Sequence, residues 1–292
     1  MNYRIVHITE YQYSGSVGLC HNEARLKPRN LPHQTCLSSY ISINPMPVDF
    51  HDREDFFGNT ASYFSIQQYH GKLTITATSE IAISPERSLF EAGNDLAWEM
   101  VKQRLHGDRS PEILDALQYT LDSPMIEANA ELAEYATQSF LPGRPLIEAV
   151  SDLMQRIFSD FTYDPEFSSI ATPLSEVLAH KRGVCQDFAH LAIACLRSQG
   201  LAARYVSGYI ETLPLPGEEK LVGADASHAW FSVYLPDAGW IDFDPTNNQM
   251  PMDRHITVAW GRDFNDVTPL KGIAFGGGQH KLSVSVDVRN LG

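Results

Sequence analysis

Near the start of the chain, hydrophobic and polar residues alternate in short runs, at 3–13, 37–43, 61–66 and 73–83. A period of two residues is typical of strands that bury one face. Turn-forming residues separate the runs, at 14–15, 28–32, 44–45, 58–59 and 70–71. The pattern predicts a small antiparallel β-sandwich or barrel-like domain over residues 1–85.

Helical spacing of apolar residues follows, at 94–105, 129–140 and 145–158. Ser110 before Pro111 predicts a further helix start, because serine caps a helix and proline fits its first turn. Thr172 is expected to cap a helix that ends at Gly183. The next helix is expected to begin at Cys185 and to end near residue 199.

Strand-like runs return after this helix, at 202–210, 229–235, 240–243 and 281–288. Helices and strands that are segregated along the chain are typical of an α+β unit. We therefore expect an α+β fold class and two domains, a β domain over residues 1–85 and a helix-then-strand domain over 86–292.

The charge of the chain narrows its partners. The 292 residues carry 22 Lys and Arg against 36 Asp and Glu, a formal net charge of −14. A general nucleic-acid binder needs a basic surface to replace the counterions of the phosphates. We therefore expect no nucleic-acid partner, and a soluble protein that favours neutral or basic partners.

The sequence shows few signals of a cellular compartment. The N-terminal residues lack the apolar core of a signal peptide, and no apolar stretch approaches the roughly 18 residues of a membrane span. The four cysteines form no CxxC pair. Reduced thiols in the cytoplasm, with no membrane association, are the expectation.

Cys185 is the residue that we expect to be the nucleophile. Gly183 permits a turn that brings Cys185 to the first turn of a helix. The free N–H groups and partial positive charge at a helix N-terminus favour thiolate over thiol. Since cysteine is more often simply buried, Cys185 needs partner groups before this reading is preferred.

His228 and an aspartate supply such partners. A hairpin turn rich in Pro, Asp and Gly places His228 opposite Thr246 or Asn247, so that Asp244 is its diagonal neighbour. Asp242 shares that face, so alternation alone does not separate the two carboxylates, and proximity favours Asp244. A thiol, an imidazole and a carboxylate form a nucleophile, its base and the group that orients the base.

Three further residues are expected near this site. The Cys185 backbone N–H is the natural first donor to an oxyanion, and Tyr163 or Gln186 is a candidate second donor. Trp230 is expected to form core or cleft wall. We expect no metal, because Cys185, His228 and Asp244 give three ligands without the short-spaced pair of a zinc site.

Three separated motifs resemble those of one known family. They are Gly183-Val184-Cys185-Gln186-Asp187, His228-Ala229-Trp230, and Trp240 followed by Asp244-Pro245-Thr246. Together they resemble the bacterial transglutaminase-like superfamily, which has a papain-like cysteine proteinase fold. Residues 6–13 and 25–29 resemble the N-terminal β domain of bacterial members, and 261–267 resemble the family's ending.

The resemblance implies that Cys185 is the nucleophile, His228 the base and Asp244 the group that orients it. The expected function is acyl transfer from peptide or carboxamide bonds through a thioester, without a cofactor and with a peptide or protein as substrate. Hydrolysis by a cysteine protease or amidase is favoured. A protein-glutamine transglutaminase that uses amine acceptors, and a binding protein that keeps the fold without turnover, are the alternatives.

Overall fold

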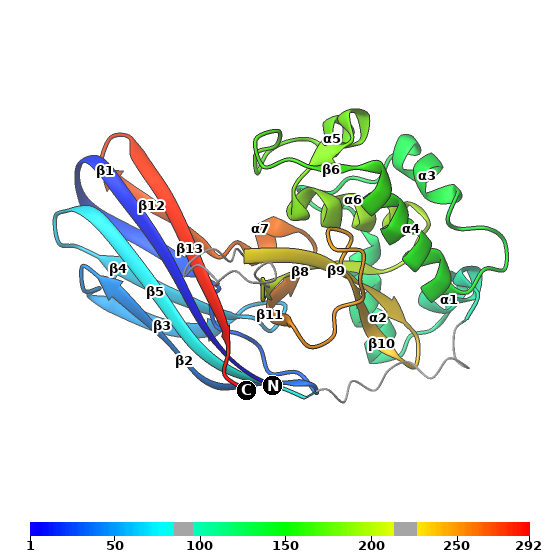
Figure 1. The fold of residues 1–292 in the computed structure, drawn as a ribbon, viewed down its shortest axis with the longest axis horizontal. Helices are drawn as coiled ribbons and strands as arrows, with labels where there is room; N and C mark the ends of the chain where they lie inside the picture. The colour runs from blue at the N-terminus through cyan, green and yellow to red at the C-terminus, as the bar shows by residue number, and fades with distance from the viewer. Residues whose placement is uncertain (85–95, 213–226) are drawn as a thin grey trace, which may run out of the picture.

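The computed structural model describes residues 1–84, 96–212 and 227–292. A long antiparallel sheet forms one side of the molecule, and a second sheet with most of the helices forms the other (Figure 1). The α+β class and the antiparallel N-terminal sheet predicted from the sequence are confirmed. Among the described residues, no helix is long and apolar enough to cross a bilayer.

The N-terminal sheet is organised around one long strand, β1 (Asn2–Ala24). The first half of β1 pairs with β5 (His70–Ile83) and β13 (His280–Asn290), and the second half with β4 (Thr60–Ile66) and β12 (Leu270–Gly276). Strands β2 (Gln34–Asn44) and β3 (Asp49–Glu54) extend the two edges. The turn predicted at 14–15 lies inside β1, where the pairing with β5 shifts register between Gln12 and Val17.

The end of the chain returns to this sheet. Tyr3 on β1 pairs with Asn290 on β13, and Ala24 pairs with Leu270 on β12. Residues 270–290, which the predicted division at residue 85 placed in the second domain, therefore hydrogen-bond to the first. The two ends of the chain lie together at one end of the sheet (Figure 1). Alternation along 281–288 revealed a strand but carried no information about which sheet it joins.

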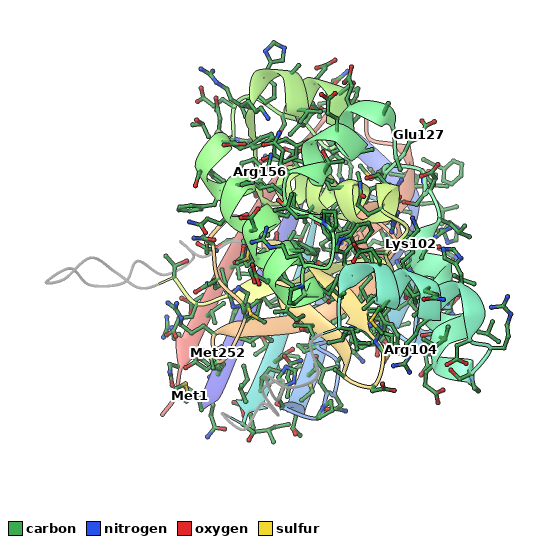
Figure 2. All side chains as sticks on the ribbon, turned by 90° about the vertical axis from the view of Figure 1, so that its right-hand side faces the viewer. Met1, Lys102, Arg104, Glu127, Arg156 and Met252 are labelled. Atoms are coloured by element: carbon green, nitrogen blue, oxygen red, sulfur yellow. The ribbon has the colours of Figure 1, made fainter. Side chains whose placement is uncertain are left out.

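Helix α6 (Cys185–Ser198) packs between three other helices and the second sheet, and it is buried from Asp187 to Arg197. Most residues of α6 are apolar, and a helix with apolar residues on most of its faces is buried at the centre of a fold. Arg104 on α1 (Trp98–Gly107) forms an ion pair of 2.6 Å with Asp237, in the turn between β9 (Ser227–Leu235) and β10 (Gly239–Phe243). Figure 2 labels Arg104 and Arg156, which lies on α4 (Leu146–Asp160), on the helical side of the molecule. The helices are α1 Trp98–Gly107, α2 Pro111–Leu117, α3 Ala130–Thr137, α4 Leu146–Asp160, α5 Leu174–His180, α6 Cys185–Ser198 and α7 Phe264–Val267, with a 3₁₀ turn at Gln118–Thr120.

The observed helix starts agree in part with those predicted from the sequence. Ser110 is the N-cap position before α2 and Pro111 opens that helix, although the serine hydroxyl makes no capping bond. The prediction that Thr172 caps the next helix is wrong, because α5 begins after Pro173 and the Thr172 hydroxyl accepts the Ser169 N–H instead. The start of the helix predicted over 94–105 lies outside the described residues, and α1 begins at Trp98.

The second sheet has the order β10-β9-β8-β11 and is antiparallel throughout. Its strands are β8 Ala203–Ile210, β9 Ser227–Leu235, β10 Gly239–Phe243 and β11 His255–Gly261. The sequence did not reveal β11, because six of its seven residues are buried and the run shows no alternation. A two-stranded parallel pair, β6 Thr162–Tyr163 and β7 Arg182–Gly183, lies before α6.

Aromatic and guanidinium groups join the two sheets. The Trp260 ring on β11 lies between the Arg29 guanidinium at 3.6 Å and the Arg204 guanidinium at 3.7 Å. Arg204 also lies 4.3 Å from the Trp240 ring. Asn59 fixes the Trp260 backbone by accepting its N–H at 3.0 Å and donating to its carbonyl at 2.8 Å. Arg29 and Asn59 come from the N-terminal part, so this stack connects it to the second sheet.

We expect Trp260→Leu to destabilise the protein while keeping an apolar side chain at the junction. Two guanidinium–ring contacts are lost, which corresponds to about 1–3 kcal/mol of unfolding free energy. Urea unfolding monitored by circular dichroism measures the change. Phe56→Leu, at a side chain that is 81% exposed, is the control and should change little. Equal stabilities of Trp260→Leu and wild type would show that the stack does not hold the sheets together.

Candidate active site

A tight turn delivers Cys185 to the start of α6. The Asp187 carboxylate accepts the Val184 N–H at 2.8 Å and the Ser168 hydroxyl at 2.5 Å, which fixes the first turn of the helix. A Cβ on Gly183 would lie 2.7 Å from that carboxylate oxygen, so only glycine fits. Cys185 itself is half-buried and opens the helix. The Asp187 carboxylate therefore faces this turn, near the helix N-terminus, where a negative charge is favourable.

His228 and Asp244 meet across the β9–β10 hairpin. Leu235 pairs with Gly239 and Phe231 with Phe243, a register that sets Asp244 diagonal to His228. The His228 Nε2 atom lies 2.8 Å from Asp244 Oδ2. Asp242, the alternative by alternation, accepts a hydrogen bond from the Ser232 hydroxyl. The structure therefore brings His228 to Asp244.

The Asp244 carboxylate has no exposed surface and is surrounded by donors. Its Oδ2 atom accepts hydrogen bonds from His228 Nε2, from His255 Nε2 at 2.9 Å and from Asn247 Nδ2 at 2.7 Å. Its Oδ1 atom accepts the backbone N–H groups of Thr246 at 3.0 Å and Asn247 at 3.3 Å. Such donors replace the water that a buried charge loses.

The charges of this group are strongly coupled. Burial opposes a proton on His228, but hydrogen bonds to Asp244 and Cys185 outweigh it and raise the pKa of His228 from 6.5 to about 10. Burial would raise the pKa of Asp244, yet the bonds from His228 and His255 hold it well below the ordinary 3.8. With Nε2 bonded to Asp244, the other ring nitrogen of His228 is the one left for the Cys185 thiol. The arrangement favours an imidazolium beside the sulfur.

The three other predicted residues lie in different surroundings. Tyr163 on β6 is 54% exposed, and its ring meets that of Phe188 edge-on, one turn along α6 from Cys185. Gln186 is half-buried, and its amide donates to the Ile170 carbonyl at 3.4 Å. Trp230 is fully buried, with its ring 5.1 Å from that of His255 at an interplanar angle of 84°.

Sequence reasoning missed His255 and the role of Asn247. Both donate to Asp244, and Asn247 Nδ2 also lies 3.3 Å from His228 Nε2. His255 opens the buried strand that alternation did not detect. A histidine at the start of an otherwise apolar run, shortly after the Asp244 motif, is the one signal the sequence offered.

His228, Asp244 and His255 also form a donor set that a metal ion could use, since their ligand atoms lie within 4.8 Å of one another. Two imidazoles and a carboxylate are ligand types that zinc accepts. Here both imidazoles bond directly to the carboxylate, and a metal would have to displace those hydrogen bonds. His228 would also lose its place beside Cys185. The contacts are therefore better explained as a hydrogen-bonded cluster.

We expect Asp244→Asn to lower the unfolding free energy at pH 7 by about 3 kcal/mol. The hydrogen-bond donors around residue 244 remain buried, but they lose the negative charge that they stabilise. The folded-state pKa of Asp244 lies below its ordinary 3.8, so this stabilisation is present above about pH 4 and is lost as the pH falls further. Urea unfolding of both proteins between pH 3 and 8 measures it. A difference that does not shrink at the acid end would contradict this account.

Comparison with known proteins agrees with these observations. Residues 3–82 match the family described as the bacterial transglutaminase-like N-terminal region, and residues 132–245 match the transglutaminase-like superfamily. An uncharacterized protein of Mycobacterium tuberculosis is 44% identical over 294 residues, which cover 98% of this chain and 92% of that protein. An uncharacterized protein of Mycobacterium leprae is 31% identical over 291 residues, 99% of this chain and 98% of its own.

A solved structure shares the fold. The crystal structure of a "Putative Cysteine Protease" from Cytophaga hutchinsonii superposes with a TM-score of 0.77 at 18% identity, over 100% of this chain and 91% of that one. The likeness therefore extends over the N-terminal sheet as well as the papain-like core. Two family matches, relatives that align over nearly the whole chain, and this shared fold lead to one conclusion. The chain belongs to the transglutaminase-like superfamily, with the bacterial N-terminal region of that group.

Proposed function

We propose that the protein is a cysteine-dependent acyl-transfer enzyme that cleaves amide bonds of a peptide or protein. The observation that carries the proposal is the convergence of Cys185, His228 and Asp244. The thiol opens a helix, the imidazole beside it has a raised pKa, and a buried carboxylate bonds the far side of that imidazole. This is the arrangement that an activated thiol nucleophile needs.

The proposed reaction has two halves. The Cys185 thiolate attacks the carbonyl carbon of the amide, and the oxyanion that forms is stabilised by the Cys185 backbone N–H. His228 gives its proton to the leaving amine as the carbon–nitrogen bond breaks, which leaves a thioester on Cys185. In the second half His228 takes a proton from the acceptor, which attacks the thioester and frees Cys185. Tyr163 and Gln186 remain candidate second donors to the oxyanion.

Water is the acceptor that we favour, which makes the enzyme a cysteine protease or amidase. Cys185 lies at a half-buried position rather than in the enclosed core, which favours access of water to the thioester that it would carry. Water is also far more abundant than any amine. A primary amine as acceptor would make the same site a transglutaminase, because both reactions pass through one thioester.

Alkylation by iodoacetamide at neutral pH should modify Cys185 first. Burial raises the pKa of Cys20 and Cys36, and raises that of Cys195 to about 12, so these thiols stay protonated. Mass mapping of tryptic peptides over time gives the rate at each site. His228→Ala should slow the labelling of Cys185 about tenfold or more, because the thiolate loses its imidazolium partner. Equal, slow labelling of all the cysteines would contradict a nucleophilic Cys185.

Product analysis identifies the acceptor. We expect a mixture of glutamine- and lysine-containing peptides to yield cleaved or deamidated products by mass spectrometry, with incorporation of added methylamine as a minor product. Cys185→Ala should give neither, and is the control. Predominant amine incorporation would establish transamidation instead. Binding of peptides by both proteins without any turnover would make the chain a binding protein that keeps the fold.

A further inference from the structure

His255 is a buried imidazole that the proposed reaction does not use. It is 2% exposed, and its Nε2 atom lies 2.9 Å from Asp244 Oδ2, the oxygen that also bonds His228. An ionised carboxylate can only accept, so His255 must carry its proton on Nε2 and donate it. Burial is the main cause that lowers the pKa of His255, so this imidazole is neutral at neutral pH. The imidazole that carries a proton on both ring nitrogens is therefore His228.

The fold provides the room for this contact. Gly208 on β8 lies between the two imidazole-bearing strands, paired with His228 on β9 and with Thr257 on β11. A Cβ at Gly208 would lie 2.5 Å from the Trp230 ring and 2.1 Å from the Ile256 carbonyl oxygen. Because residue 208 has no side chain, the Trp230 ring can lie over β8 and contact His255. The Trp230 ring then packs edge-on against His255 and limits its rotation.

We propose that His255 is a positioning residue, which holds the Asp244 carboxylate in the orientation that bonds His228. The inference rests on the proposed function. His228, Asn247 and the backbone donors approach from β9 and from the loop after β10, while His255 approaches from β11. Among these donors, His255 is therefore the one that connects the carboxylate to β11, the edge strand opposite β10. Without it, Oδ2 keeps only His228 and Asn247 of these three donors, and the carboxylate is held less firmly in the orientation that bonds His228.

The test compares His255→Met with His255→Gln. The two side chains have similar size, but only glutamine carries an N–H, and its amide nitrogen takes about the place of imidazole Nε2. The probe is p-nitrophenyl acetate, whose ester bond breaks as Cys185 takes the acetyl group, releasing p-nitrophenolate in a burst. Hydrogen bonds to charged groups of this kind correspond to about a 10- to 100-fold effect. We expect His255→Met to slow the burst by that factor and His255→Gln to restore most of it.

Two further variants separate positioning from packing. His7→Met alters another histidine that is 2% exposed, which lies on β1 and is hydrogen-bonded to Thr9 of the same strand and to Tyr209 of β8. It makes no bond to Asp244, so it should slow the burst less than twofold. In an Asp244→Ala background, His255→Met should have no further effect, because the residue through which it acts is gone. Thermal unfolding of each variant confirms that it is folded under the assay conditions.

Several results would overturn the inference. His255→Met could react as fast as wild type, His255→Gln could be as slow as His255→Met, or the effect of His255→Met could persist without Asp244. Stoichiometric zinc in the purified protein that His255→Met loses would make the cluster a metal site. Failure of the proposed function has a different signature, in which Cys185→Ala keeps the burst of wild type.

Discussion

A carboxylate without exposed surface must find hydrogen-bond donors inside the fold, and Asp244 finds them from three parts of the chain. His228 reaches it from β9, His255 from β11, and the loop after β10 supplies backbone and amide groups. These strands must assemble in one register before the charge is compensated. The requirement that places the base of the proposed reaction therefore also specifies the order of the second sheet.

The same sheet is coupled to the N-terminal part through its edge strand β11. Trp260 lies between guanidinium groups of the two parts, and Gln34 bonds the backbone of Thr257 with both ends of its amide. His255 lies on this strand. A strand that anchors the N-terminal part at one point thus contacts the Asp244 carboxylate at another, which makes the N-terminal sheet part of the support of the site.

Much of this arrangement could be predicted from local sequence. The helix start at Cys185 and the hairpin that pairs His228 with Asp244 follow from turn residues and alternation, which act over short distances. His255 could not be placed in this way, because β11 is buried on both faces and shows no period. The return of 270–290 to the first sheet is a pairing across nearly the whole chain, and strand patterns do not encode their partners.

That return has a consequence for how the molecule forms. The chain leaves the N-terminal sheet after Ile83 and rejoins it at Leu270, so the half that bears the candidate site lies inside the sheet's sequence as an insertion. During synthesis β1 emerges before this inserted half, but its partner strands β12 and β13 emerge after it. Contacts between residues so far apart in sequence form slowly. The half that bears Cys185 can therefore pack its helices around α6 before β12 and β13 pair with β1, and we expect the first sheet to be completed late in folding.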